Sequence, residues 1–488
     1  MTSFVLAIDI GTTSTKVLAV LPDGQVLKSD QSFYPTRYPY PGHAEQDPWQ
    51  LLHAVKHSIN RVLHDIPSGF VLAAGSLSSA MHSFMAIDEQ GNPITPLLLW
   101  ADTRSSKQAR LIRNTELGHQ LHDQTGTAIH PMSPLCKLLW YKEHQPEVIQ
   151  RAFKFISIKE FVVHHLCGEY LVDYSIASAT GLFDFRQLSW SNEALTLVGI
   201  GSDKLSRPVP TDHRIYLKSG VVDSFPLWKE AAPLFLGASD GCLAQLGSDA
   251  MHQDAMTITL GTSGAVRRVA PLELKDRDRK LFRYLLYADT MIAGGATNNG
   301  TVVLDWFARE FESSDTDLTQ VVKNALQVPP GCEELIALPF LLGERAPIYN
   351  PEARGVFFNV SPRHTRNHFA RALMEGICFE IKTIVESVEE VCGSAKRVLV
   401  SGGITHAPEW IQLLSDVLGK NLIVTGAHDA SAIGAARLAF NALHIPFKNI
   451  VPAGKTYIPN QTLSKLYSHQ FERFKRLYTG LEEQFGEN

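Results

Sequence analysis

The chain has 488 residues, of which 44% are hydrophobic, and a formal net charge of −5 at pH 7. This length exceeds the size at which one hydrophobic core stops growing, so two domains are expected. The small net charge, without a block of lysine and arginine, argues against nucleic acid or an anionic membrane as the main partner and favours small-molecule chemistry.

The six cysteines lie scattered without a C-x-x-C pair, a pattern typical of reduced thiols in a cytosolic protein. The N-terminus lacks a basic segment, and no stretch approaches the roughly 18 apolar residues that a membrane span needs. We therefore expect a soluble, cytoplasmic protein.

Residues 6–20 join two short apolar runs through a turn. Both runs are rich in β-branched and aliphatic residues, so each predicts a strand of a hairpin. The turn offers a glycine for close approach to an anion, hydroxyl and amide donors, and a cation, which are the features of a phosphate loop. These residues are Gly11, Thr12, Thr13 and Lys16.

Asp9 stands at the end of the first strand of this hairpin. An unpaired carboxylate at a buried strand end is costly, and a metal ion bound to nucleotide phosphates would remove that cost. Taken alone, a threonine-rich hairpin turn beside a capping aspartate is an equally good interpretation, because short motifs of this kind recur by chance.

A helix is predicted to begin at Pro48, with Asp47 as its cap and an apolar face at helical spacing as far as Leu63. Strands, then this helix, then a strand near Val71, then further helices describe an α/β domain. It ends after the turn at residues 235–241, so we place the first domain at residues 1–246.

Residues 257–266 repeat the pattern of the first hairpin. Gly261 matches Gly11 and Thr262 matches Thr12, whereas Thr259 stands where the first copy has its acid. The repeat implies two related halves that share phosphate binding, with a nucleotide held between two lobes.

In the second domain, residues 247–446, a strand at 397–400 runs into Gly402 and Gly403 before a helix that opens at Pro408. Glycines in this position let a ligand approach the backbone. Residues 429–436 form another small-residue helix start, for which helix packing and ligand contact both stay open. The tail, residues 447–488, is predicted to be a helix docked on one of the two lobes, with the N-terminal domain as one candidate.

Two further patterns are interpreted as decoys. Residues 454–456 end like a Walker A motif, but Asn449 stands where the leading glycine is required. His164 and His165 form a lone pair in a helical stretch and predict packing rather than a metal site.

Several longer blocks resemble the FGGY family of carbohydrate kinases over nearly the whole chain. Residues 132–144 resemble its first diagnostic pattern, departing at Tyr141, and residues 355–360 with 368–375 resemble the second, departing at Asn359. The resemblance implies an α/β fold of two ribonuclease-H-like domains, of the actin and heat-shock-chaperone superfamily, with a cleft between them. It also implies ATP and Mg²⁺ as cofactors.

The resemblance assigns roles to the two hairpins. Asp9 is expected to tether Mg²⁺ through water, with Thr12, Thr13 and Lys16 around the phosphates. Gly261 and Thr262 are expected to hold the phosphates from the other lobe, and Gly402, Gly403 and Gly300 to flank the adenosine. Thr301 stands where family members often carry glycine, which leaves that last contact open.

Asp240 sits where the family places its catalytic base. A carboxylate within hydrogen-bond reach of a sugar hydroxyl can orient it and accept its proton while the hydroxyl attacks the γ-phosphoryl group in line. Without the family context, an aspartate before glycine is more often a turn residue.

The expected sugar pocket contains Met81 and His82 with Trp100, Asp102 and Arg104. The strings around these residues most closely resemble the gluconate kinases of the family. A gluconate carboxylate needs a cation in a partly desolvated pocket, and Arg104, His82 or Arg345 could serve.

We therefore expect ATP-dependent phosphorylation of D-gluconate to 6-phospho-D-gluconate. A xylulokinase or another pentulose or polyol kinase is the first alternative, because Met81-His82 also resembles the xylulokinase pattern. A non-catalytic regulator that binds sugar or nucleotide is an alternative of another class. Sugar and ATP are the expected partners, and a homodimer stays open.

Overall fold

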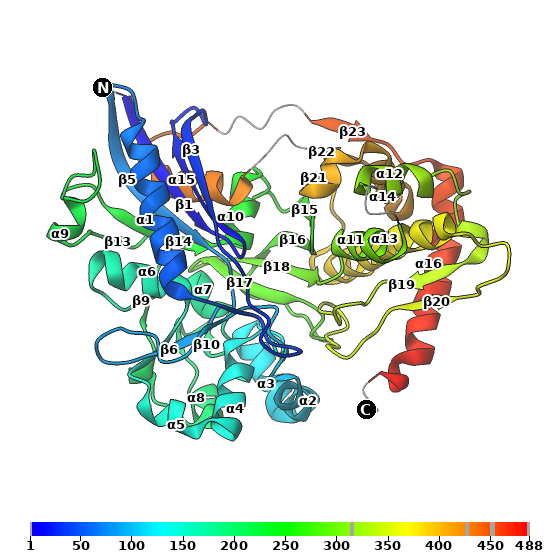
Figure 1. Ribbon diagram of the computed structural model, residues 1–488, viewed down its shortest axis with the longest axis horizontal. Coiled ribbons are helices and arrows are strands. Elements are labelled where there is room, and N and C mark those ends of the chain that lie inside the picture. The colour runs from blue at the N-terminus through cyan, green and yellow to red at the C-terminus, as the bar shows by residue number, and fades with distance from the viewer. Residues whose placement is uncertain (1, 313–316, 425–428, 449–453, 486–488) are drawn as a thin grey trace.

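The computed structural model describes residues 2–312, 317–424, 429–448 and 454–485. Two α/β domains lie side by side, each built on one mixed sheet (Figure 1). The chain passes from the first to the second between helix α10 (Asp240–Gly247) and strand β15 (Ala255–Leu260). The predicted fold class is confirmed.

The N-terminal sheet has the strand order β13-β14-β5-β1-β2-β3. The first three strands in the chain are antiparallel neighbours, whereas β5 and β14 add on in parallel. The strands are β1 (Thr2–Ile10), β2 (Ser14–Val20), β3 (Val26–Phe33), β5 (Phe70–Ser79), β13 (Arg214–Ile215) and β14 (Leu234–Ser239).

The C-terminal sheet repeats this plan in the order β17-β18-β16-β15-β21-β22-β23. Three antiparallel strands are again followed by two parallel ones, so that β15 corresponds to β1, β16 to β2 and β21 to β5. The two phosphate-like hairpins therefore occupy equivalent places. Besides β15, the strands are β16 (Gly264–Pro271), β17 (Phe282–Tyr287), β18 (Thr290–Thr297), β21 (Arg397–Ser401), β22 (Leu422–Val424) and β23 (Lys455–Tyr457).

Amphipathic helices cover the sheets. Helix α1 (Pro48–His64) begins where the sequence predicts, with the Asp47 carboxylate accepting from the backbone N–H of Trp49, and its apolar face packs on β2 and β3. In the C-terminal domain, the helices that cover the sheet are α11 (Val302–Phe311), α12 (Leu318–Ala325), α13 (Arg366–Cys392) and α14 (Pro408–Leu418).

The rest of the N-terminal domain consists of short elements, most of which lie below the sheet in Figure 1. Its helices are α2 (Ser106–Arg113), α3 (Glu116–Thr125), α4 (Pro134–His144), α5 (Pro146–Arg151), α6 (Ile158–Cys167), α7 (Tyr174–Ser178), α8 (Asn192–Val198) and α9 (Ser219–Val222). Its short strands are β4 (Glu45–Gln46), β6 (Met85–Ile87), β7 (Leu97–Leu98), β8 (Lys154–Ile156), β9 (Leu171–Asp173), β10 (Phe183–Asp184), β11 (Ser189–Trp190) and β12 (Arg207–Val209), while β19 (Ile336–Leu338) and β20 (Val356–Phe358) pair in the C-terminal domain.

Helix α15 (Ala430–Ala442) joins the two domains. It follows the C-terminal sheet in the chain but packs on β1 and β5 of the N-terminal sheet and along α10. A Cβ atom added at Gly434 would lie 2.0 Å from the carbonyl oxygen of Leu243, so only glycine permits this approach. Tight helix packing therefore accounts for most of the small residues at 429–436.

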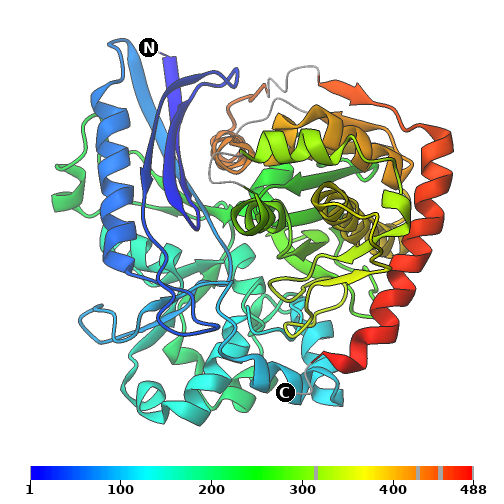
Figure 2. The same cartoon turned by 45° about the vertical axis from the view of Figure 1, so that its right-hand side comes forward.

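The C-terminal tail packs for most of its length on the C-terminal domain, not on the N-terminal domain. Helix α16 (Gln461–Leu481) runs along the outer edge of the C-terminal domain, where it contacts α13 and α14 (Figure 2). Phe471 and Phe474 enter that domain's core, and the Tyr467 hydroxyl accepts from the Arg371 guanidinium at 2.7 Å. The apolar face of the tail thus completes the core of the domain that precedes it. Residues 449–453 and 486–488 of the tail lie outside the described residues.

The two decoys behave as predicted. Lys455 and Thr456 belong to strand β23 rather than to a loop before a helix. His164 stacks on Tyr170 and His165 packs against Phe161. Within the described ranges, three or more metal-ligating side chains never gather in one place, and every helix is too short or too polar to cross a membrane.

Candidate active site

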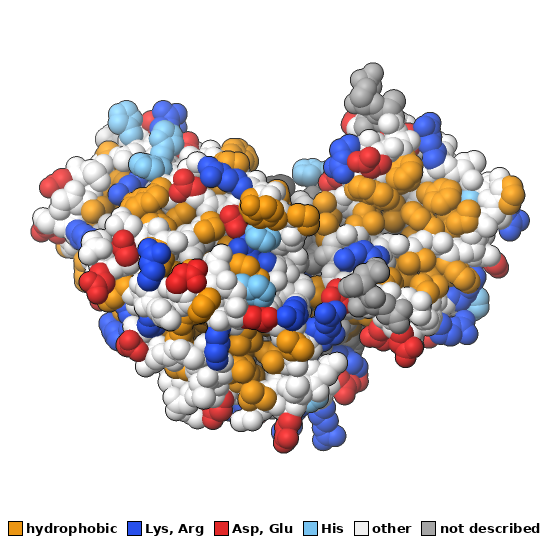
Figure 3. Space-filling model, turned by 60° about the horizontal axis from the view of Figure 1, so that its bottom comes forward, with side chains coloured by type: hydrophobic (Ala, Val, Ile, Leu, Met, Phe, Trp, Pro, Cys, Tyr) orange, Lys and Arg blue, Asp and Glu red, His pale blue; other side chains and the backbone are white. Residues whose placement is uncertain are grey.

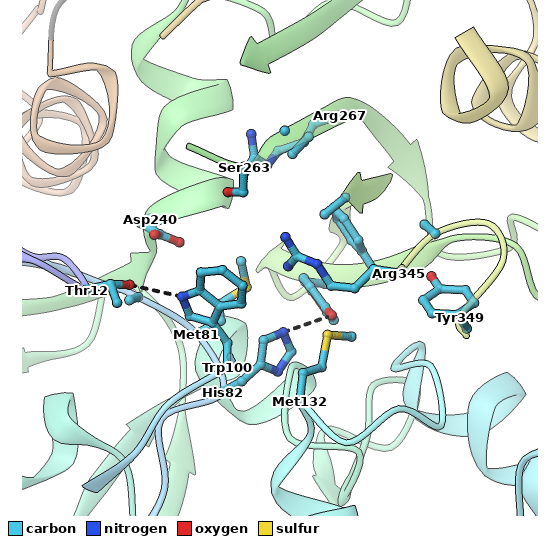
Figure 4. A pocket seen from close by; sticks show the side chains of 17 residues that line it. Thr12, Met81, His82, Trp100, Met132, Asp240, Ser263, Arg267, Arg345 and Tyr349 are labelled. Carbon is cyan, nitrogen blue, oxygen red and sulfur yellow. Dashed lines mark hydrogen bonds between the residues drawn. The ribbon is translucent and has the colours of Figure 1, made fainter. Parts of the chain in front are cut away.

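A cavity of about 190 Å³ lies between the two domains, where the surface is hollowed between the lobes (Figure 3). The N-terminal domain contributes predicted site residues to its wall, and the C-terminal domain contributes two arginines (Figure 4). These residues are Thr12, Met81, His82, Trp100 and Asp240 on one side, and Arg267 and Arg345 on the other.

Asp240 is the first residue of α10 and faces this cavity. The preceding Ser239 caps the helix, and the backbone N–H of Gly241 donates to Asp240 Oδ1 at 2.6 Å. Burial raises the pKa of Asp240 to about 6; the charge of Asp9 acts in the same direction, and that of Arg267 opposes it. The carboxyl group is thus tuned toward neutral pH, as a general base requires.

A buried polar network holds the strand end that carries Asp240. Lys159 Nζ donates to Asp173 Oδ2 at 2.7 Å and to the carbonyl oxygen of Ala238 at 3.0 Å. The backbone N–H of Ser239 donates to Ser175 Oγ at 3.1 Å. Sequence patterns assigned no role to Lys159, because an isolated lysine in a helical stretch ordinarily lies on a solvated face.

Side chains from neighbouring segments donate hydrogen bonds to the carbonyl groups of the first hairpin turn. The Tyr34 hydroxyl donates to the carbonyl oxygen of Gly11 at 2.7 Å, and Gln46 Nε2 donates to that of Thr12 at 2.7 Å. Trp100 Nε1 donates to Thr12 Oγ1 at 3.0 Å, which links the turn to the sugar pocket (Figure 4). Thr13 lies exposed at the tip. The turn is therefore rigid, with its exposed tip available to a ligand.

Asp9 is paired in register with Lys16 at the base of this hairpin, and both reach α15. Ser431 Oγ donates to Asp9 Oδ2 at 2.6 Å, and Lys16 Nζ lies 2.5 Å from Asp429 Oδ1. Asp9 Oδ1 is buried without a hydrogen-bond partner, and burial raises the pKa of this carboxyl. An orphaned buried carboxylate oxygen is what a site for a hydrated cation would provide, so the residues fit Mg²⁺.

The second hairpin turn meets the other predicted nucleotide residues. A Cβ atom at Gly300 would lie 2.2 Å from the carbonyl oxygen of Gly261, and one at Gly402 would lie 2.6 Å from that of Leu260. Gly403 packs on Gly261, and the Thr301 N–H donates to the Gly261 carbonyl at 2.7 Å. The structure thus gathers Gly261, Thr262, Gly300, Gly402 and Gly403 into one surface of close backbone packing.

His82 and Trp100 form the floor of the sugar pocket. His82 Nδ1 donates to the carbonyl oxygen of Ala179 at 2.7 Å, while Nε2 lies 3.4 Å from the Tyr284 hydroxyl. Burial lowers the pKa of His82 to about 3, so the ring is neutral and Nε2 is left as an acceptor. Lys137, to which the sequence patterns assigned no role, donates to the carbonyl oxygen of His82 at 2.7 Å and fixes its backbone.

Asp102 and Arg104 do not line the cavity, which corrects their predicted role in sugar binding. Arg104 Nη2 bonds Asp102 Oδ2 at 2.8 Å and Glu45 Oε1 at 2.5 Å, and Asp102 also accepts from the backbone N–H of Ala44. Two carboxylates thus already neutralise this guanidinium, so its charge is not available to a substrate.

Arg345, the other arginine that the sequence pointed to, does line the cavity. Its guanidinium carbon lies 4.8 Å from the centre of the Trp100 ring, and its Nη2 donates to the carbonyl oxygen of Thr297 at 3.0 Å. Arg267 also lines the cavity, although the sequence patterns assigned it no role. It stands three residues beyond the second hairpin turn. The only signal in the sequence is its position in a strand that alternates core and cleft residues.

Comparison with known families gives a match over most of the chain. The family model for the N-terminal domain of the FGGY family of carbohydrate kinases matches residues 4–247, and the model for its C-terminal domain matches residues 256–443. Gluconokinase from Bacillus subtilis (strain 168) is 35% identical over 517 aligned residues, which cover 99% of each chain.

Solved structures share the whole architecture. Gluconate kinase from Lactobacillus acidophilus is similar with a TM-score of 0.93 at 29% identity, covering 100% of this chain and 99% of the other. Ligand-bound xylulose kinase from the same species reaches a TM-score of 0.93 at 28% identity, covering 99% of each chain. Both domains, and the cleft between them, therefore have counterparts in proteins of known activity.

Proposed function

This chain belongs to the FGGY family of carbohydrate kinases, and from that membership we propose that it transfers the γ-phosphoryl group of ATP to the terminal hydroxyl of D-gluconate. One observation carries the proposal: Asp240 presents a carboxyl of raised pKa to a cavity that also touches both hairpin turns. A binding protein without catalysis would have no use for a base in that place.

The acceptor hydroxyl would donate its hydrogen bond to Asp240. As the hydroxyl oxygen attacks, its O–H bond breaks and the proton passes to the carboxylate; a new P–O bond forms, and the bond from the γ-phosphorus to its bridging oxygen breaks to release ADP. His82 Nε2 and the Tyr284 hydroxyl would bind the other hydroxyl groups of the chain. The Trp100 ring would provide the rigid wall against which the acceptor lies.

The two hairpins would bind the phosphates. Backbone and hydroxyl groups of Gly11, Thr12 and Thr13, with the ammonium of Lys16, would act from one lobe, and Gly261 and Thr262 from the other. Asp9 would hold Mg²⁺ through water, with Ser431 fixing its second oxygen. When bound, Mg²⁺ would offset the charge on the phosphate oxygens. Gly300, Gly402 and Gly403 would leave room for the adenosine.

Gluconate is favoured over xylulose by two lines of support. The curated relative that covers this chain at 35% identity is a gluconokinase. The cavity wall carries two arginines and one aspartate, so its net charge suits an anion. ATP as donor implies a compartment that supplies it, which agrees with a cytoplasmic location.

ADP release measured against gluconate, xylulose, ribulose, fuculose and glycerol tests this function. We expect kcat/KM for gluconate to exceed every other value by at least about tenfold, because a site built for a charged group rejects analogues that lack it. A preference for xylulose would change the proposed substrate and leave the proposed kinase activity in place. Sugar binding without ADP release from any of the five would indicate a regulator.

The activity should fall at acidic pH. Asp240 must be unprotonated to accept a proton. Its raised pKa of about 6 therefore places the loss of activity near pH 6 and not near pH 4. With both substrates below saturation, kcat/KM should be flat above about pH 7 and fall about tenfold per unit below pH 6. Saturating Mg-ATP should move this limb to lower pH, because a cation beside Asp9 favours the charged base. A profile that stays flat to pH 5 would contradict the assignment of the base.

A further inference from the structure

Arg267 is a partly buried cation with few protein partners. It lies on β16, where Val266 points into the domain core while Ala265 and Arg267 face the cleft. Its Nη1 donates to Thr259 Oγ1 at 3.3 Å, its buried Nε has no partner, and among the described residues it forms no ion pair. The charge of Asp240 offsets part of the cost of desolvating this guanidinium, and an anion bound to it would offset more.

A second guanidinium faces the same cavity. Burial lowers the pKa of Arg345; the charge of Glu344 opposes this effect, and that of Arg267 adds to it, so the two arginines repel one another across the cavity. Among the described residues that line the cavity, Asp240 is the one carboxylate, and it serves as the base. An anion brought in by the substrate would relieve this repulsion.

Gly241 provides the room that Arg267 occupies. A Cβ atom at this position would lie 2.9 Å from Arg267 Nε and 3.1 Å from Met81 Cε. Any larger residue after the catalytic base would push the guanidinium away. The Asp240-Gly241 pair therefore does two things, since the first residue supplies the base and the second admits the cation beside it.

Arg267 lies on the wall of the sugar cavity, which it shares with Met81 and His82. Its charge acts on Asp240 and on Tyr284, which both line the sugar pocket. The charged groups that act on Asp9, at the predicted metal and phosphate site, are instead Asp429 and Lys16. The shared cavity wall favours the acceptor as the anion that Arg267 meets. The hydrogen bond to Thr259, on the strand before the second hairpin turn, makes the γ-phosphoryl group the alternative that the experiment must exclude.

We propose that Arg267, admitted by Gly241, binds the carboxylate of the acceptor and makes this kinase selective for sugar acids over neutral polyols. The inference rests on the proposed kinase function and adds its specificity residue. Arg345, over Trp100, holds the acceptor from the adjacent wall.

The test compares D-gluconate with D-glucitol, a neutral polyol of equal length with a hydroxymethyl group in place of the carboxylate. In Arg267→Met we expect the KM and the calorimetric Kd of gluconate to rise about 10- to 100-fold, as for a lost hydrogen-bonded charge contact, with kcat within about threefold. The Kd of glucitol should change by less than about twofold. Arg267→Lys, which keeps the charge without the fork, should recover part of the gluconate affinity.

Arg309→Met is the matched control, because Arg309 is an exposed arginine of the same domain that pairs with Glu310. It should leave both dissociation constants unchanged. Equal weakening of gluconate and glucitol, or a fall of kcat with every acceptor, would overturn the proposal and assign Arg267 to the phosphoryl group. An unchanged gluconate Kd would overturn it as well. Turnover of gluconate by the unaltered protein tests the kinase function separately.

Gly241→Ala tests whether the glycine acts through the arginine. We expect it to raise the Kd of gluconate to about the same extent as Arg267→Met does. The Kd of glucitol should stay within about twofold. The double variant should bind gluconate no more weakly than either single variant, since both substitutions remove the same interaction. Additive losses would contradict the role given to Gly241.

Discussion

Asp240→Asn should lower kcat by about 10²- to 10⁴-fold, the usual contribution of a positioned general base. The amide keeps the shape of the side chain but cannot accept the proton of the acceptor hydroxyl. Gluconate should bind with a Kd within a few-fold of that of the unaltered protein, because the amide still offers an oxygen. Steady-state ADP release and calorimetry measure the two effects separately.

The folded state of this variant should be at least as stable as that of the parent. The pKa of Asp240 is raised in the folded protein, so the folded state binds more protons than the unfolded state between about pH 4 and 6. The carboxyl therefore stabilises the fold less as pH rises through this window, and a neutral amide avoids that loss. Asp289→Asn, in the exposed turn between β17 and β18, is the control and should retain full activity. Undiminished turnover by Asp240→Asn would remove Asp240 from the mechanism.

Asp9→Asn should produce the second large loss, about 10²-fold or more in kcat/KM for Mg-ATP. The orphaned Oδ1 of Asp9 is the group that we assign to hydrated Mg²⁺, and an amide attracts a cation far less than a carboxylate. The Mg²⁺ concentration that gives half-maximal rate should rise, and added Mg²⁺ should restore part of the activity. Both are measured by titrating Mg²⁺ at fixed ATP.

Gluconate binding distinguishes this effect from misfolding. In Asp9→Asn, Ser431 can still donate to the oxygen of the new amide, so the Kd of gluconate without nucleotide should stay within about twofold. Ser431→Ala, which removes the donor and keeps the acid, should give a smaller rise in the Mg²⁺ requirement. An unchanged Mg²⁺ dependence in Asp9→Asn would contradict the assignment of the metal.

Local patterns in the sequence were enough for the two hairpins. Their strands follow from runs of aliphatic and β-branched residues, and their turns from Gly11 and Gly261, where the backbone must approach closely. The start of α1 at Pro48 follows equally from its cap and proline. Such features depend on neighbours within a few residues, so the chain specifies them before it folds.

Residues that act through distant partners carry no such local pattern. Arg104 looked available because the sequence does not reveal that Glu45 and Asp102 neutralise it. Arg267 looked like any polar residue of a strand, because its cleft is closed by α10 from the other domain. The sequence patterns gave no role to Lys137 and Lys159, although both are buried supports of the site.

The sequence by itself determined the two-fold repeat and the family, and it marked the two aspartates that we propose for the metal and for the base, because each stands in a short motif with its own chemistry. Tertiary structure alone decided where charge is available and where helices dock. Helix α15 crosses to the N-terminal sheet and brings Ser431 to Asp9, while α16 packs mainly on its own domain. Whether a charged side chain binds a substrate depends on which opposite charges the fold brings within reach of it, and that is a property of contacts between segments far apart in the chain.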